Sequence, residues 1–255
     1  MTVHVERQAG IVTVTMDRPD KLNAMTDPMW RALDAALGTI GDARVLVLTG
    51  AGGAFCAGSD VGGLLGTDEP MGDRIRLMNR VLNQLHELPI PTVAKVDGVA
   101  AGAGANLALV CDFVLASDRS RFMELFIRRA LSLDSGASWL LPRLVGDRRA
   151  RELAMLGDTV GAVDAERYGL INRVVPVAEL DTEVAALAER LAQLPAPALR
   201  GTKQLLLDSW GSTFAEAMEA ETVNQLTVLD TPETRTTISR YNRETAGPTG
   251  ADSPR

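Results

Sequence analysis

The stretch Arg44–Asp60, with the sequence RVLVLTGAGGAFCAGSD, decides the fold class. Its first part is a nearly continuous apolar run, which is typical of a strand buried on both faces. Its second part is rich in glycine and alanine, and a helical pattern with Ile75, Met78, Leu82 and Leu85 follows it. The same order recurs in residues 92–110 as a strand, a glycine-rich loop and a helix. This repetition predicts an α/β fold.

Outward from this centre, the two ends of the chain differ in character. Val3–Val5 and Ile11–Met16 are rich in β-branched residues and predict strands. After about residue 138 the pattern is helical, with predicted helices at 138–145, 148–156, 178–194, 198–210, 214–229 and 232–244. The Pro195-Ala196-Pro197 segment marks a boundary. We therefore predict a core at 1–195 and a C-terminal helical region at 196–255.

The composition excludes several classes of protein. Lys and Arg number 26 against 33 Asp and Glu, so the net charge of −7 argues against a nucleic-acid-binding surface. Cys56 and Cys111 provide neither a disulfide framework nor a metal set. His4 and His86 argue against a histidine-based metal centre or a Ser-His-Asp triad. No signal peptide or membrane span is predicted, which favours a protein of the reducing cytoplasm.

Each of the two glycine-rich loops follows a predicted strand and precedes a helix. Small residues let a backbone approach a ligand closely, and N–H groups at a helix start lack helical partners. Two such groups directed at one carbonyl oxygen would form an oxyanion hole, whereas the alternative is that the glycines serve only tight packing. Phosphate motifs do not fit, because Gly102–Leu107 lacks the third glycine of the dinucleotide fingerprint and the sequence contains no P-loop.

Five segments resemble, in order, the signatures of the crotonase superfamily, the enoyl-CoA hydratase/isomerase family. Arg18–Ala24, with the sequence RPDKLNA, is similar to its N-terminal signature. Gly50–Asp60 and Val96–Gly104 resemble its two oxyanion segments. Asp134–Gly146 and Ala165–Pro176 resemble a third and a fourth block. Each match is weak alone, but five in register over about residues 1–200 are specific.

The resemblance implies an α/β, crotonase-like spiral of ββα repeats with a C-terminal helical trimerisation region. It also implies a homotrimer or a dimer of trimers, acting on acyl-CoA thioesters. Coenzyme A would be part of the substrate, and no separate cofactor, metal, nucleic acid or membrane partner is expected.

Carried onto this sequence, the resemblance places the thioester oxygen between the backbone N–H groups of Ala57 and Ala103. The second position is usually glycine in the family, but alanine keeps the N–H group. The acyl-CoA interpretation depends on these two amides converging on one carbonyl. The residues implied to lie near the CoA moiety are Lys21, Leu22, Ala24, Gly58, Ser59 and Asp60. For Lys21, the alternative is a solvated surface lysine.

The carboxylate residues at the site distinguish the hydratases of the family from its isomerase-like members. Hydratases of the family use two glutamates, and Asn106 and Phe126 align with those positions here. Asp134 is the replacement that we expect, because its block resembles the segment in which isomerase-like members carry a proton-shuttling aspartate. The alternative for Asp134 is an N-cap of the helix beginning near residues 135–138. Glu124 is a second candidate, although an exposed or paired charge is the favoured interpretation of its position.

One carboxylate suffices for a 1,3-proton shift, so the favoured function is an enoyl-CoA isomerase. The alternatives are an enoyl-CoA hydratase with an atypical carboxylate set, which could include Glu124, and a non-catalytic acyl-CoA-binding homologue. A hydrolase or dehalogenase with Asp134 as nucleophile is also compatible with this scaffold. The glycine-containing segment Val61–Asp73 is expected to shape the acyl pocket.

Overall fold

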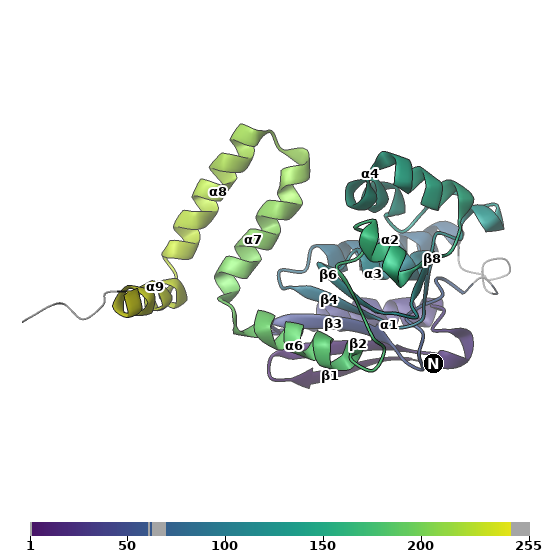
Figure 1. Ribbon diagram of the computed structural model, residues 1–255, viewed down its shortest axis with the longest axis horizontal. Coiled ribbons are helices and arrows are strands. Elements are labelled where there is room, and N and C mark those ends of the chain that lie inside the picture. The colour runs from purple at the N-terminus through teal and green to yellow at the C-terminus, as the bar shows by residue number, and fades with distance from the viewer. Residues whose placement is uncertain (1, 61, 63–69, 246–255) are drawn as a thin grey trace, which may run out of the picture. The chain divides into compact units, whose positions relative to one another are not determined.

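The computed structural model describes residues 2–60, 62 and 70–245 (Figure 1). Most of the segment expected to shape the acyl pocket, residues 61 and 63–69, lies outside the described residues. The chain divides into two compact units, Met1–Gln193 and Leu194–Arg255. The break stands close to the boundary predicted after residue 195.

The first unit is built on two sheets. The larger sheet has six strands in the order β1-β2-β3-β4-β6-β9, and the smaller has three in the order β5-β7-β8. β1 and β2 form an antiparallel hairpin, and the remaining neighbours in the larger sheet are parallel. The strands are β1 (Thr2–Gln8), β2 (Ile11–Asp17), β3 (Val45–Gly50), β4 (Thr92–Val96), β5 (Val99–Ala101), β6 (Phe113–Ser117), β7 (Arg121–Met123), β8 (Val160–Gly161) and β9 (Arg173–Val175).

The chain advances by adding a strand to each sheet in turn. β4 runs into β5 and then into helix α3 (Ala103–Leu109), and β6 runs into β7. β4 pairs with β6 and β5 pairs with β7, both in parallel. Equivalent strands of successive turns therefore lie side by side. The predicted α/β fold with ββα repeats is confirmed.

β3 is buried on both faces, as its apolar run predicts. Leu46 and Leu48 belong to the main hydrophobic core. Val45 and Val47 belong to a second cluster on the opposite face, which α6 (Leu180–Gln193) covers. Because successive side chains of a strand alternate between faces, a strand buried on both faces needs apolar residues throughout.

Around the sheets, the helices largely follow the predicted pattern. The two helices expected at 138–145 and 148–156 are both present within α4 (Ala137–Leu156), where Gly146, with φ 74° and ψ 162°, breaks the helical backbone between them. The short strands β5, β7, β8 and β9 were not predicted, because two or three residues carry too little periodicity. The remaining helices of this unit are α1 (Asp27–Gly38), α2 (Met71–His86), α4 (Ala137–Leu156) and α5 (Ala162–Arg167).

The second unit is helical and comprises α7 (Ala196–Asp208), α8 (Phe214–Leu229) and α9 (Pro232–Thr245). α7 and α8 approach closely at Gly201, where a Cβ atom would lie 2.3 Å from the Oδ1 atom of Asn224. Large apolar side chains of this unit are exposed, among them Leu206, Trp210, Phe214, Met218, Val223, Leu226 and Tyr241. In the part of the chain that the structure describes, no helix is long and apolar enough to cross a membrane.

The loops that follow β3 and β4 are joined through their backbones. The N–H groups of Phe55 and Cys56 donate to the carbonyl of Val99 at 3.0 and 2.9 Å. The N–H group of Ala101 donates back to the carbonyl of Cys56 at 2.9 Å. Gly104, in the first turn of α3, packs against this junction so closely that a Cβ atom would lie 2.2 Å from the Cys56 carbonyl oxygen.

This contact predicts that Gly104→Ala destabilises the fold, because the added methyl group must push α3 away from the first loop. Overpacking of this kind costs about 1–3 kcal/mol. Urea unfolding measures the loss. Gly211→Ala is the matched control, because a Cβ atom there meets nothing within 4 Å. Equal stability of the two variants would contradict the predicted contact.

Candidate active site

A cavity of about 280 Å³ lies where the two glycine-rich loops meet. Its walls combine loop backbone with apolar side chains and a few charged groups. The lining residues used below are Ala57, Gly58, Ser59, Gly102, Ala103, Phe126 and Asp134. A small concave site of this kind, with few polar groups converging on it, is typical of a ligand-binding cavity.

The amide of Ala57 does not face this cavity as a free donor. It donates to the carbonyl of Leu22 at 2.9 Å. The expectation that the Ala57 N–H group holds a ligand is therefore wrong for this structure. The amide is used instead to join the first glycine-rich loop to the N-terminal segment that contains Lys21 and Leu22.

Ser59, two residues further along, is a candidate for the donor that the sequence analysis placed at Ala57. Among the described residues, the Ser59 N–H group has no hydrogen-bond partner, and Ser59 lines the cavity. Between the two residues, Gly58 has φ 95°, a backbone conformation that turns the chain and favours glycine. The turn at Gly58 redirects the next amide, so the donor lies two residues beyond the predicted position.

Ala103 lies where the sequence predicts the second donor. It is the first residue of α3, so its N–H group has no partner within the helix. The Ala103 nitrogen lies 3.6 Å from the place that a Cβ atom on Gly58 would occupy. The amides of Ser59 and Ala103 therefore belong to adjacent stretches of one cavity wall.

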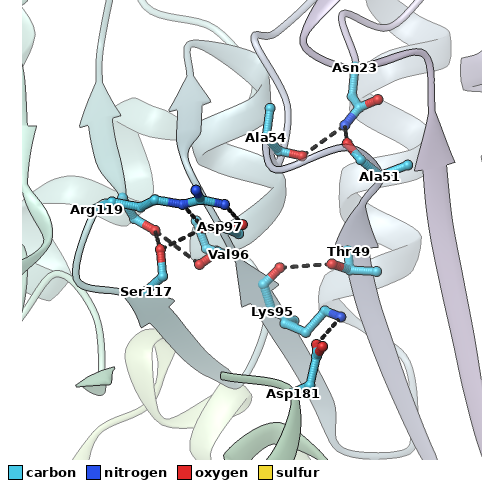
Figure 2. A network of polar contacts seen from close by, with 11 residues as sticks. Asn23, Thr49, Ala51, Ala54, Lys95, Val96, Asp97, Ser117, Arg119 and Asp181 are labelled. Atoms are coloured by element: carbon cyan, nitrogen blue, oxygen red, sulfur yellow. Dashed lines mark hydrogen bonds and ion pairs between the residues drawn. The ribbon is translucent and has the colours of Figure 1, made fainter. Parts of the chain in front are cut away.

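The N-terminal RPDKLNA segment is held against the first loop by side chains that the sequence analysis did not assign. The Asn23 side chain is fully buried, and its Nδ2 atom donates to the carbonyls of Ala51 and Ala54 at 2.8 Å each (Figure 2). Its Oδ1 atom accepts from the backbone N–H of Arg18 at 2.8 Å. Three backbone groups thus depend on one side chain for their hydrogen bonds.

Of the six residues implied to contact CoA, Gly58 and Ser59 line the cavity. Asp60 has a structural partner: its Oδ2 atom lies 2.6 Å from the Arg18 guanidinium, which lowers the pKa of the Asp60 carboxyl. The carbonyl of Ala24 accepts from the same guanidinium at 3.0 Å. Lys21 and Leu22 are exposed. Contact of these residues with CoA stays a prediction.

Asp134 lies in the cavity wall and does not cap a helix. The N-cap of α4 is Gly136, and no side chain caps that helix. One carboxylate oxygen of Asp134 accepts a hydrogen bond of 2.5 Å from the Ser135 hydroxyl. Burial raises the pKa of the Asp134 carboxyl, and the Ser135 hydrogen bond partly offsets this rise. The capping alternative is therefore wrong.

Glu124 is the functional candidate that the sequence analysis undervalued. An exposed or ion-paired charge was favoured, but the residue is only 5% exposed. Its Oε2 atom lies 3.5 Å from Nδ2 of Asn106, and burial raises the pKa of its carboxyl to about 8. The hydrophobic periodicity of a helix or strand could not reveal that Glu124 is buried, because β7 has only three residues and Glu124 follows its end.

Asn106 and Phe126, the two residues that align with the glutamates of the family's hydratases, are both buried. Phe126 lines the cavity, and Asn106 is buried in α3 with its Nδ2 atom 3.3 Å from the carbonyl oxygen of Gly102. Within the described ranges, no group of His, Cys, Asp or Glu side chains could hold a metal ion.

Comparison of the sequence with known protein families identifies the family of this chain. The sequence pattern of the family described as Enoyl-CoA hydratase/isomerase matches residues 6–248. The chain belongs to this family. The crotonase resemblance predicted from the five segments is thus confirmed, and the protein is an acyl-CoA-transforming member of the enoyl-CoA hydratase/isomerase family.

Relatives of this family member carry different activities in their names. A protein of Rhodobacter capsulatus named a probable enoyl-CoA hydratase is 40% identical over 207 residues, which cover 80% of each chain. The 1,2-epoxyphenylacetyl-CoA isomerase of Escherichia coli K12 is 37% identical over 226 residues, which cover 86% of each chain. The family assignment therefore leaves the reaction to be argued from the site.

Solved structures support the same fold. One from Streptomyces coelicolor A3(2) is 39% identical and has a TM-score of 0.90, covering 95% of this chain and 91% of that one. Another, from Thermobifida fusca YX in complex with CoA, is 32% identical and has a TM-score of 0.83, covering 89% and 92%.

The burial of Glu124 predicts a pH-dependent effect on stability. Because its pKa rises from 4.5 to about 8 on folding, the native state keeps a proton that the unfolded chain loses. The contribution of this group to the free energy of unfolding therefore falls as pH rises through that interval. Glu124→Gln lacks this effect, so its stability relative to wild type should increase between pH 4.5 and 8.

Urea unfolding at several pH values in this interval measures the difference. The control is Glu189→Gln, because Glu189 is exposed on α6 and should give no pH-dependent difference. A constant difference between Glu124→Gln and wild type would contradict a buried, protonated Glu124.

Proposed function

We propose that this protein is an enoyl-CoA isomerase that moves a double bond by a 1,3-proton shift, with Asp134 as the proton carrier. The observation that carries the proposal is that Asp134 lines the same cavity as Ser59 and Ala103. Asp27 also lines this cavity, but its carboxylate is engaged in an ion pair of 2.6 Å with the Arg74 guanidinium.

In the proposed mechanism, the amides of Ser59 and Ala103 donate to the thioester oxygen. Their hydrogen bonds strengthen as negative charge develops on that oxygen, which makes the proton on the neighbouring carbon more acidic. Asp134 takes a proton from C4 of a 2-enoyl or C2 of a 3-enoyl thioester, leaving an enolate. The carboxylic acid then returns the proton at the other end of the conjugated system. No water, metal or cofactor beyond the CoA of the substrate takes part.

The environment of Asp134 suits this role. Burial raises the pKa of its carboxyl, which brings the carboxylate closer to the basicity that proton abstraction requires. The Ser135 hydroxyl fixes one oxygen and leaves the other available to the substrate. Lys21, exposed beside the first loop, is proposed to contact a phosphate of CoA.

Hydration is the second candidate, and Glu124 is the observation that favours it. Its carboxyl is a second buried acid with a raised pKa, and the charge of Asp134 contributes to that rise. Two carboxyl groups of different acidity could activate water and supply a proton. Incubation with crotonyl-CoA followed by mass spectrometry tests this reaction, because hydration adds the mass of one water molecule to the thioester, whereas isomerisation leaves its mass unchanged. Tight acyl-CoA binding without turnover of either substrate would favour the non-catalytic alternative.

The isomerase proposal predicts that Asp134→Asn abolishes conversion of a 3-enoyl-CoA into its 2-enoyl isomer while acyl-CoA binding persists. Loss of a general acid–base group lowers kcat by about 10²–10⁴-fold. Absorbance of the conjugated product measures turnover, and calorimetry measures binding. Asp42→Asn, at an exposed position, is the control. Undiminished turnover by Asp134→Asn would eliminate Asp134 as the proton carrier.

We further propose that the second unit assembles the chain into a homotrimer or a dimer of trimers. Phe214 is 81% exposed and Leu226 is 64% exposed, and an apolar surface of this kind is typical of subunit interfaces. In a trimer these side chains would be covered by other copies.

Light scattering is therefore expected to give at least three times the 27.2 kDa of one chain. Leu226→Asp should lower this mass, because a charge cannot be buried in an apolar interface without a large desolvation penalty. Met155→Asp, on the first unit at 66% exposure, is the matched control. A wild-type protein that is monomeric at micromolar concentration would refute the assembly.

A further inference from the structure

Asn106 contacts the peptide unit that presents the second oxyanion donor. Its Nδ2 atom donates to the carbonyl of Gly102 at 3.3 Å, and the Asn106 backbone N–H donates to the same carbonyl at 3.1 Å. The Gly102 carbonyl and the Ala103 N–H belong to one planar peptide group. Hydrogen bonds accepted by the carbonyl polarise that group, so they orient the Ala103 N–H and make it a better donor.

Glu124 holds the Asn106 side chain in this orientation. An amide nitrogen carries two hydrogens, and the second one of Asn106 is directed to Oε2 of Glu124 at 3.5 Å. The Asn106 Oδ1 atom is buried and has no partner within the described residues. The orientation of the amide therefore depends on its two Nδ2 contacts, to Gly102 and to Glu124.

We propose that Glu124 is a positioning residue for the reaction: through Asn106 it holds the Gly102–Ala103 peptide with its N–H toward the thioester oxygen, and it does so as a neutral acid. This inference rests on the proposed enolate chemistry. It adds a hydrogen-bonded chain from Glu124 through Asn106 and the Gly102 carbonyl to the Ala103 amide and the substrate.

Neutrality follows from the surroundings of Glu124. Among the described residues, the polar groups acting on its carboxyl are the Asn106 amide from α3 and the Asp134 carboxylate from the segment before α4. Among the residues that the structure describes, no cation forms an ion pair with Glu124, and Arg128 pairs with Asp158 instead. The Asn106 hydrogen bond favours the ionised form of Glu124, but burial, which is the largest effect, and the Asp134 charge favour the protonated form and outweigh it. A negative charge here would oppose the enolate and the ionised Asp134.

The inference predicts a decline of kcat as pH rises through about 8, where Glu124 ionises. Glu124→Ala should lower kcat about tenfold with little change in KM, because the donor loses support that matters most as charge develops. Glu124→Gln keeps a neutral acceptor for Asn106. It should recover most of the lost kcat and abolish the alkaline decline. Glu189→Gln, at an exposed site, should keep the wild-type pH profile.

A second measurement needs no turnover. Bound 2,4-hexadienoyl-CoA absorbs at longer wavelength when hydrogen bonds polarise its thioester carbonyl, so its absorbance reports the oxyanion donors directly. Glu124→Ala should reduce this red shift, and Glu124→Gln should retain it. In wild type, the red shift should weaken above pH 8, whereas in Glu124→Gln it should not.

The two measurements separate this inference from the proposed function. If no isomerisation occurs but the red shift follows the predicted order, the isomerase assignment fails and the role of Glu124 stands. The inference is overturned if Glu124→Ala leaves the red shift unchanged. It is also overturned if Glu124→Gln loses kcat as severely as Glu124→Ala, or keeps the alkaline decline.

Discussion

The backbone junction between the loops after β3 and β4 is the contact on which the site depends. Cys56 exchanges hydrogen bonds with the Val99–Ala101 strand, and Gly104 packs against its carbonyl with no room for a side chain. This junction pairs the amides of Phe55, Cys56 and Ala101 and thereby holds together the two loops that carry the amides of Ser59 and Ala103. Rigid, preorganised donors stabilise developing charge better than mobile ones. A glycine is therefore required at Gly104 because the Cys56 carbonyl leaves no room for a side chain, and at Gly58 because the turn has a positive φ.

Charge around the cavity is arranged so that different carboxyl groups have different acidity. The Arg18 guanidinium lowers the pKa of Asp60, and Asp27 is paired with Arg74. Asp134 and Glu124 are instead shifted upward by burial. Ion-paired carboxylates hold loops together, whereas burial favours the protonated forms of Asp134 and Glu124. Asp60 and Asp27 thus have a guanidinium beside them, whereas Asp134 and Glu124, which are proposed to act in the reaction, are shifted by burial.

The two units of the chain differ in how they use apolar residues. In the first unit, apolar side chains fill clusters on both faces of the larger sheet. In the second, many large apolar side chains stay exposed along α7 and α8. Three helices offer little interior to one another, so these residues can be buried only against further protein.

The sequence by itself determined the α/β class, the central strands and helices and the family, and it identified Asp134 as a candidate, because periodicity and the order of motifs can be read along the chain. The tertiary structure alone decided which amide is free: the positive φ of Gly58 and the bond from Ala57 to Leu22 move the donor to Ser59. It also decided that Glu124 is buried, since its partner Asn106 lies 18 positions earlier in the chain. Direction of an N–H group and desolvation of a carboxyl both depend on segments distant in sequence, so no local pattern encodes them.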